Sequence, residues 1–261
     1  MNKINNTKQL ILFKDIFGKK VEADFQGGEV SSDAGLLFLR EVEREVGLFH
    51  RVAEVLRDRR HAGYVKHQIV KLLKQRVFQI ACGYEDGDDS DELRNDPVLK
   101  MACERLPDEE PLASQPTISR FENALSHTDL YRIAEVFLDI FIESYEKPPE
   151  AIILDIDDTD DPTHGHQQLA LFNAFHNNYC YMPIHIYEGK SGKLITTVLR
   201  PGKRPTGEQI VSILKRVVKR IKEAWPQVGI LLRGDSYYSC PAVYEFCDEE
   251  EIKTQNNKIY S

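Results

Sequence analysis

The apolar positions of the chain follow one rhythm in the first half and another in the second. From Ser32 to Tyr145 they recur every three or four residues, which is the spacing of one face of an α-helix. Two such sets are Val65, Ile69, Leu72, Leu73, Val77 and Ile80, and Leu130, Ile133, Val136, Phe137, Ile140 and Phe141. This spacing predicts an all-helical region, preceded by a weakly patterned segment over residues 1–30.

After Lys147-Pro148-Pro149 the pattern changes to strands, because proline ends a helix. The runs Tyr181–Tyr187 and Leu194–Leu199 are joined by a turn with two glycines, which predicts an antiparallel hairpin. Thr206 and Gln209 have the spacing of a capping box and predict the start of the next helix. The predicted order is acidic strand, two hairpin strands, helix, acidic strand, helix.

Both acidic strands end in carboxylates. Residues 151–161 read AIILDIDDTDD, and residues 228–238 read VGILLRGDSYY. Because side chains alternate along a strand, Asp155 and Asp157 lie on one face, roughly 6 to 7 Å apart. Carboxylates held this close repel each other, and a hard cation such as Mg²⁺ or Mn²⁺ relieves that repulsion. A solvated acidic loop is the alternative, and a second strand-end acid, Asp235, favours a metal site.

This order of elements is that of a ribonuclease-H-like core, in which the first and fourth strands are neighbours. Asp157 and Asp235 would then bring their carboxylates within roughly 4 to 7 Å of each other and share Mg²⁺ or Mn²⁺. Such a site would activate a water or a 3′-hydroxyl for displacement at a phosphodiester. Asp155 is the alternative for the first acid.

The charge is unevenly distributed. The formal net charge of −8 over 261 residues argues against a nucleic-acid ligand, yet residues 190–222 contain ten bases and a single acid, Glu208. The candidate DNA contacts are Arg200, Lys203, Arg204, Lys215, Lys219 and Lys222, with Arg120 on a short helix of the first half. A second basic stretch covers residues 57–76. A solvated helix face is the alternative for each stretch.

Other features exclude several classes of protein. The chain has no apolar run of about eighteen residues and no signal-peptide pattern, so we expect a soluble cytoplasmic protein with no membrane contact. The five cysteines form no C-x-x-C pair, which supports neither zinc nor disulfides. His164, His166 and His176 are expected to be loop hydrogen-bonding residues, because carboxylate-rich sites favour hard metals. Residues 155–166 lack the glycine and glutamate of an EF-hand.

Several ordered motifs between about residues 22 and 252 resemble those of one family of bacterial proteins. They read FQGGEVSSDAGLLFLREVE, QPTISRFENAL, ILDIDDTDDPTHGHQ, YCYMPIHIY, LRPGKRPTG and LLRGDSYYS. They are similar to those of the insertion-sequence DDE transposases of the group numbered thirteen-eighty. The resemblance implies DNA transposition by metal-dependent phosphodiester cleavage and strand transfer, with a magnesium-dependent Asp-Asp-Glu triad.

Carried onto this sequence, the resemblance assigns Asp157 as the first acid and Asp235 as the second. It implies double-stranded DNA as partner, both the terminal inverted repeats and the target, and a site of action in the bacterial cytoplasm at the nucleoid. It leaves a homo-oligomer open. Members of the family continue into a further strand and a helix with the third acid, a glutamate, for which Glu249, Glu250 and Glu251 come too soon after Asp235.

We therefore expect a C-terminally truncated and catalytically impaired chain. Its fold class would be α+β, an N-terminal all-helical region followed by a partial ribonuclease-H-like α/β domain with a mixed sheet. The expected parts are the segment 1–30, a helical DNA-binding or assembly region over 31–147, the incomplete catalytic domain over 148–252 and a polar tail over 253–261.

Two alternatives remain. AIILDIDDT also fits the D-x-D-x-T signature of haloacid-dehalogenase-type phosphatases, with Asp155 as nucleophile, Asp157 as general acid and Asp235 as a metal ligand. That fold needs a helix after the first strand, whereas a hairpin is predicted here. The second alternative is a DNA-binding remnant without catalytic activity.

Overall fold

The computed structural model describes residues 11–23, 33–163 and 169–256. The chain divides into two compact units, Met1–Asp129 (unit 1) and Leu130–Ser261 (unit 2). No helix among the described residues is long and apolar enough to cross a membrane.

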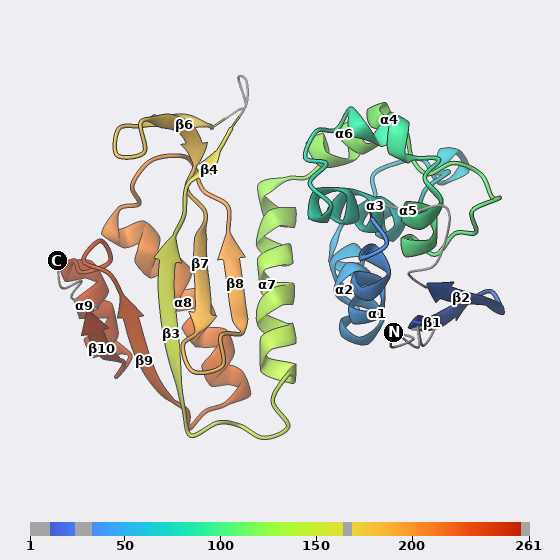
Figure 1. Ribbon diagram of the computed structural model, residues 1–261. Coiled ribbons are helices and arrows are strands. Elements are labelled where there is room, and N and C mark those ends of the chain that lie inside the picture. Colours follow the sequence, from blue (N-terminus) through green and yellow to red (C-terminus); the bar gives the residue numbers. More distant parts are fainter. Residues whose placement is uncertain (1–10, 24–32, 164–168, 257–261) are drawn as a thin grey trace, which may run out of the picture. The chain divides into compact units, whose positions relative to one another are not determined.

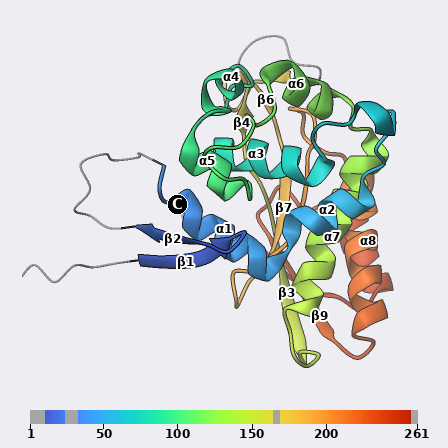
Figure 2. The same cartoon turned by 90° about the vertical axis from the view of Figure 1, so that its right-hand side faces the viewer.

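Unit 1 begins with a hairpin and continues with helices. The hairpin consists of β1 (Ile11–Ile16) and β2 (Lys19–Ala23) and lies beside α1 in Figures 1 and 2. The helices are α1 (Leu36–Val46), α2 (Leu48–Val55), the 3₁₀ turn η1 (Ala62–Tyr64), α3 (Ile69–Ala81), α4 (Asp89–Leu93), α5 (Pro97–Ala102) and α6 (Gln115–Asn123). The fully buried Arg40 joins hairpin to helix, since its guanidinium donates to the Lys14 carbonyl at 2.8 Å. The hairpin lies within the segment predicted to be weakly patterned.

Unit 2 is built on a mixed sheet of five strands. Its elements are α7 (His127–Glu143, of which the first three residues belong to unit 1), β3 (Ala151–Asp158), β4 (Asp161–Pro162), β5 (Leu171–Asn173), β6 (Asn178–Tyr181), β7 (Ile184–Glu188), β8 (Leu194–Val198), α8 (Gly207–Ala224), β9 (Gly229–Gly234), α9 (Pro241–Glu249) and β10 (Lys253–Asn256). The strand order is β10-β9-β3-β7-β8. β3 pairs antiparallel with β7 and parallel with β9 (Figure 1).

The two faces of β3 explain its sequence. Ile152, Leu154 and Ile156 are buried in the main core of unit 2, together with apolar residues of α8 such as Leu214 and Val218. The intervening side chains, Asp155 and Asp157 among them, are half-buried or exposed on the other face. Alternation along the strand therefore separates the core from the acidic residues.

The boundary between the units comes earlier than Lys147, where the sequence suggested it. α7 belongs mainly to unit 2, because Leu138 and Phe141 are buried in the same core as the sheet. α7 itself ends at Glu143, and Pro148 and Pro149 lie in the segment between this helix and β3. Tertiary burial, rather than the local helix breaker, sets the division.

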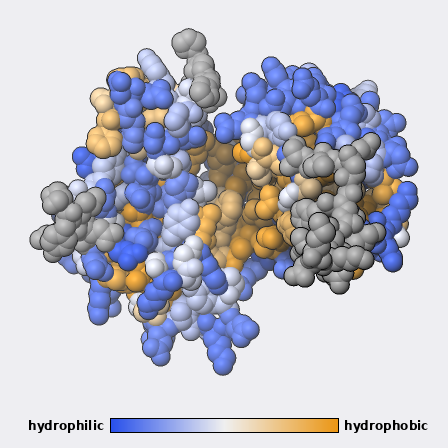
Figure 3. Space-filling model, viewed as in Figure 1, coloured by the Kyte–Doolittle hydropathy of each residue, from blue (hydrophilic) through white to orange (hydrophobic). Residues whose placement is uncertain are grey.

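The predicted strand Tyr181–Tyr187 is divided between two sheets. β6 belongs to a three-stranded sheet of order β4-β6-β5, and β7 to the main sheet. Pro183 lies between them and has no N–H to donate to a ladder. Phe172 in β5 and Phe175 in the turn after it are exposed. Figure 3 shows orange residues at the upper left, where the small sheet lies in Figure 1.

Candidate functional site

The register of β3 against β9 brings the two predicted acids together. Ile156 lies opposite Gly234, the last residue of β9, so Asp157 and Asp235 follow at the same end of neighbouring parallel strands. Neighbouring strands are about 4.8 Å apart. The two carboxylates therefore come from adjacent backbone positions although they are 78 positions apart in the sequence.

Each of these carboxylates is partly held by its own backbone. Asp157 Oδ1 accepts a hydrogen bond from the Asp158 amide at 2.9 Å, and Asp235 Oδ1 accepts one from the Tyr237 amide at 2.8 Å. Within the described residues, no lysine, arginine or histidine forms an ion pair with either. Two neighbouring negative charges are thus left without a protein cation.

Asp158 and Tyr238 lie next to the two acids, on the face of the sheet that packs against the core. The Tyr238 hydroxyl donates to Asp158 Oδ1 at 3.0 Å. Burial raises the pKa of Asp158, and the charges of Asp157 and Asp235 raise it further, against the effect of the tyrosine hydrogen bond. Burial also raises the pKa of Tyr237 to about 12, so this phenol stays protonated at neutral pH. The negative charges of Asp157 and Asp235 therefore disfavour ionisation of Asp158.

Asp155, the alternative first acid, already has a partner. Arg233 Nε donates to Asp155 Oδ1 at 2.9 Å, and Arg233 Nη2 donates to Asp155 Oδ2. This ion pair is bidentate, and bidentate contacts are among the strongest that arginine forms with carboxylates. The hydrogen bond with Asp155 also raises the pKa of Arg233. Asp155 thus ties β3 to β9, and Asp157 is left as the acid available for a cation.

The donor set fits a hard divalent cation shared with a phosphate. Mg²⁺ in proteins is often held by one or two carboxylates together with substrate phosphate oxygens and water. Among the described residues, no three histidine, cysteine, aspartate or glutamate side chains form a metal-binding group. Asp157 and Asp235 are therefore two candidate ligands of a site that substrate oxygens would complete.

The other predicted ligands lie elsewhere. His176 faces Asp160 at 3.6 Å, and His164 and His166 fall outside the described residues. Glu249 ends α9, and Glu250 forms an ion pair with Lys222 at 2.7 Å. His176 and Glu250 thus have partners other than Asp157 and Asp235.

A basic loop with Arg200, Lys203 and Arg204 follows β8. It lies beside the acidic edge, which is the end of the sheet where Asp157 and Asp235 follow β3 and β9. Arg200 Nη2 donates to Gln209 Oε1 at 3.0 Å, whereas Lys203 is exposed. The Arg204 guanidinium stacks on the Tyr237 ring at 4.1 Å and donates to the Tyr237 carbonyl. Burial lowers the pKa of Arg200, while nearby Asp158 acts in the opposite direction. These contacts connect the loop to the segment after Asp235.

The remaining predicted DNA contacts are distributed along α8 and in unit 1. Lys215 and Lys219 are exposed, and Lys219 lies 3.9 Å from Glu223. Lys222, another predicted DNA contact, is half-buried, and its ammonium donates to both the carboxylate and the carbonyl of Glu250. Arg120 is exposed on α6 in unit 1.

Sequence reasoning missed Arg233, Tyr237 and Tyr238 as parts of this site. The two tyrosines directly follow Asp235 in RGDSYY, so their proximity was a usable signal. Arg233 required the β3–β9 register, since only that register places it opposite Asp155.

Comparison with known proteins identifies the family. The model of the family described as "Transposase DDE domain group 1" matches residues 13–255. No curated protein matches the chain. Among solved structures, the catalytic domain of Mos1 mariner transposase is 14% identical with a TM-score of 0.33, covering 52% of this chain and 64% of that one.

Two complexes are further matches. The Mos1 transposase paired-end complex with left transposon end is 13% identical with a TM-score of 0.31, covering 91% of this chain and 71% of the other. The piggyBac transposase synaptic complex with hairpin DNA is 11% identical with a TM-score of 0.35, covering 86% and 49%. The chain thus spans less than two thirds of the Mos1 catalytic domain and about half of the piggyBac chain. The model of the family matches nearly the whole sequence, and the chain therefore belongs to the transposase DDE domain family, group 1.

Proposed function

We propose that the chain acts in DNA transposition, as a transposase of a bacterial insertion sequence of the group numbered thirteen-eighty. The observation that carries the proposal is the parallel pairing of β3 with β9, which leaves Asp157 and Asp235 side by side at one sheet edge. The order β10-β9-β3-β7-β8, in which β7 alone runs opposite to the other four strands of this sheet, supports a ribonuclease-H-like catalytic domain.

Asp157 and Asp235 would hold Mg²⁺ or Mn²⁺ through carboxylate oxygens. When bound, such an ion stabilises charge on a phosphodiester undergoing displacement and lowers the pKa of an attacking water or 3′-hydroxyl. Asp155 and Arg233 keep the two strands in register, and Tyr238 holds Asp158 beneath the edge. The chain's own contribution is therefore a rigid placement of two uncompensated carboxylates.

Arg200, Lys203 and Arg204 are the proposed contacts to the DNA backbone nearest the acids. α8 follows this loop and β9 follows α8, so the helix begins near the acidic edge and its later residues run away from it. Lys215 and Lys219 would reach only DNA that extends along the helix. The proposed partners are the terminal inverted repeats and target DNA, bound in the bacterial cytoplasm by a homo-oligomer.

Replacing Lys203 and Arg204 by alanine is expected to weaken binding of duplex DNA at all sequences alike. Each lost phosphate contact lowers the slope of log K against log salt by about 0.9, so the double variant should lose about 1.8. Fluorescence anisotropy of labelled duplex DNA measures this slope at salt concentrations from about 50 to about 200 mM, a range over which phosphate contacts change the affinity strongly.

The matched control is Lys219→Ala/Lys222→Ala at the far end of α8. It removes the same charge but is expected to change the slope less, because Lys222 is paired with Glu250. Equal slopes for the two double variants would contradict the assignment of the basic loop.

The purified chain is expected to nick DNA that carries the element's own ends only slowly, if at all. The described residues supply two neighbouring acids and no third ligand, so alignment of an attacking oxygen lacks a carboxylate. Incubation with Mn²⁺ beside an Asp157→Ala control measures the activity. Efficient metal-dependent nicking that disappears in the control would show an intact active site and contradict the proposed impairment.

Two observations weigh against the phosphatase alternative. β7, the strand that follows β3 in the main sheet, is antiparallel to it, and Asp155, the required nucleophile, is bound by Arg233. The second candidate function is that of a DNA-binding remnant without catalytic activity. Such a remnant would show the same salt dependence of DNA binding as the proposed transposase, but it would not bind Mn²⁺.

A further inference from the structure

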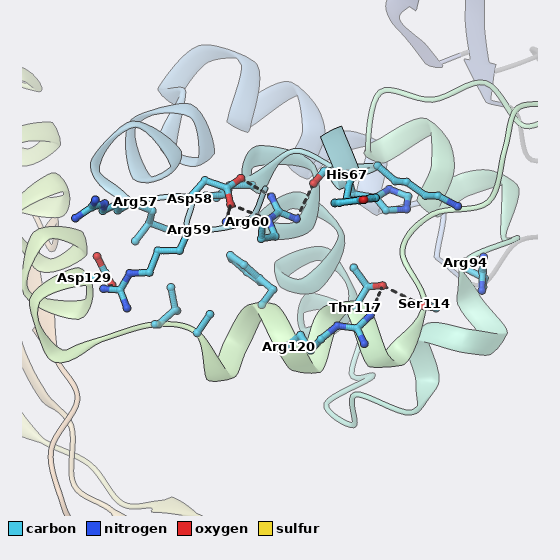
Figure 4. A pocket seen from close by; sticks show the side chains of 17 residues that line it. Arg57, Asp58, Arg59, Arg60, His67, Arg94, Ser114, Thr117, Arg120 and Asp129 are labelled. Carbon is cyan, nitrogen blue, oxygen red and sulfur yellow. Dashed lines mark hydrogen bonds and ion pairs between the residues drawn. The ribbon is translucent and has the colours of Figure 1, made fainter. Parts of the chain in front are cut away.

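A second cationic site lies within unit 1. A pocket of about 580 Å³ opens between the segment that joins α2 to α3 and helix α6 with the turn after it (Figure 4). Six cations line it: Arg57, Arg59, Arg60, Lys66, Arg94 and Arg120. Only two carboxylates, Asp58 and Asp129, line the same pocket. In a chain with a net charge of −8, this local excess marks a site for an anion.

The two carboxylates are already engaged with two of the cations. Asp58 accepts from Arg60 Nε at 2.8 Å, and Asp129 lies 3.9 Å from Arg59. Arg57 and Lys66 are exposed and form no hydrogen bond or ion pair with any described residue. Their charges are therefore available to a ligand.

Several contacts hold the walls of the pocket in place. Arg60 also donates to the His67 carbonyl at 3.0 Å, and this hydrogen bond stabilises the segment between α2 and α3. The buried amide of Gln75 exchanges two hydrogen bonds of 2.8 Å with the backbone of Ala113, just before α6. Arg120 projects from α6, and Thr117 lies one turn before it (Figure 4). The cations thus line the pocket from two anchored segments.

The pocket also has an aromatic and apolar part. Tyr64 lies in η1 and is 85% exposed, with its ring centroid 5.3 Å from that of His61. Leu56, Ile69 and Phe121 add apolar lining. A volume of 580 Å³ falls in the range of small-molecule sites, about 300 to 1,000 Å³, and suits a ligand larger than a single phosphate ion.

We propose that this pocket binds an unpaired DNA strand, with successive backbone phosphates at Arg57, Lys66 and Arg120 and the base of one nucleotide against Tyr64. Cations matched to a backbone phosphate and an exposed aromatic ring matched to a base are the two elements of single-strand recognition. The inference rests on the proposed function for the identity of the strand as DNA. It adds a second DNA site, in unit 1, distinct from the acidic edge of unit 2.

The test is the affinity of the 261-residue chain for a labelled single-stranded oligonucleotide, measured by fluorescence anisotropy. Arg57→Glu/Lys66→Glu is expected to weaken binding at least about tenfold, since two phosphate contacts become repulsive. Lys19→Glu/Lys20→Glu is the matched control, because it makes the same charge change at two exposed hairpin residues. Equal losses in the two double variants would overturn the proposal.

Tyr64→Ala tests the base contact. It is expected to weaken single-strand binding about fivefold or more, the lower end of the effect of losing one stacked base. Phe175→Ala, at a residue that is 91% exposed in unit 2, is the control and should leave binding unchanged. Unchanged binding by Tyr64→Ala would overturn the nucleotide assignment and leave a site for backbone phosphate alone.

Competition identifies the source of the nucleotide. An unlabelled oligonucleotide is expected to displace the probe at far lower concentration than deoxyadenosine monophosphate, and inorganic phosphate least well. Equal displacement by phosphate and by the mononucleotide would overturn the role of the base. Equal displacement by mononucleotide and oligonucleotide would replace the strand with a free nucleotide and overturn the proposal as stated.

Asp157→Ala separates this inference from the proposed function. The variant is expected to bind the single strand as the parent chain does, because Asp157 belongs to unit 2. Loss of single-strand binding in Asp157→Ala would locate the signal at the acidic edge and refute the pocket. Failure of the parent chain to bind Mn²⁺, with the pocket variants behaving as expected, would count against the proposed function alone.

Discussion

Replacing Asp157 by asparagine is expected to weaken Mn²⁺ binding by more than about 100-fold, because losing even an outer hydrogen-bonding partner of a metal ligand costs 10- to 100-fold. Asp235→Asn should have an effect of the same size, since the two carboxylates stand side by side and neither forms an ion pair with a lysine, arginine or histidine that the structure describes. Isothermal titration with Mn²⁺ at neutral pH measures the affinity, and thermal melts check that each variant is folded.

Asp155→Asn is the matched control for this prediction. It makes the same chemical change two residues earlier on β3, but at a carboxylate bound by Arg233. We expect it to retain Mn²⁺ binding and to unfold at a lower temperature. Retained binding in Asp157→Asn together with loss in Asp155→Asn would make Asp155 the first acid, and unaffected binding in Asp235→Asn would disprove a shared site.

Gly202→Ala is expected to destabilise unit 2 by about 1 to 3 kcal/mol, the usual cost of overpacking a filled site. Gly202 is buried in the basic loop, and an added Cβ would overlap the carbonyl oxygens of Cys180 and Leu171, which are backbone atoms of the three-stranded sheet. The loop must move, which shifts Lys203 and Arg204. Urea unfolding measures the loss of stability, and the DNA salt titration measures the displacement of the two bases.

Gly87→Ala serves as the control for this change. Gly87 has no positive φ, and an added Cβ there meets no atom within 4 Å. Its free energy of unfolding should therefore change little. A Gly202→Ala chain as stable as the Gly87→Ala chain, with an unchanged salt slope, would show that the loop does not depend on this close approach.

Local elements of unit 2 were accessible from the sequence. The predicted capping box at Thr206 and Gln209 is present at the start of α8. The turn before Lys193 joins two antiparallel strands, with Gly192 in the left-handed region at φ 69°. These features depend on contacts between residues a few positions apart, which hydrophobic periodicity and turn chemistry encode directly.

Long-range pairing decided the rest. The sequence showed that Asp155, Asp157 and Asp235 end two strands, but it left open which acid is available, because the answer depends on the register between β3 and β9. That register pairs Asp155 with Arg233 and leaves Asp157 beside Asp235.

The same limit applies to the division of the chain and to the pocket of unit 1. Pro148 and Pro149 lie between α7 and β3, yet burial of Phe141 in the core of the sheet assigns the helix to unit 2. The basic stretch from Arg57 onward was visible as charge, but only the tertiary structure joins it to Arg120 on α6 around one cavity. By itself, the sequence determined the elements and the chemical groups that they carry. Which groups meet was decided by the tertiary structure, because packing free energy depends on contacts between segments that local periodicity cannot specify.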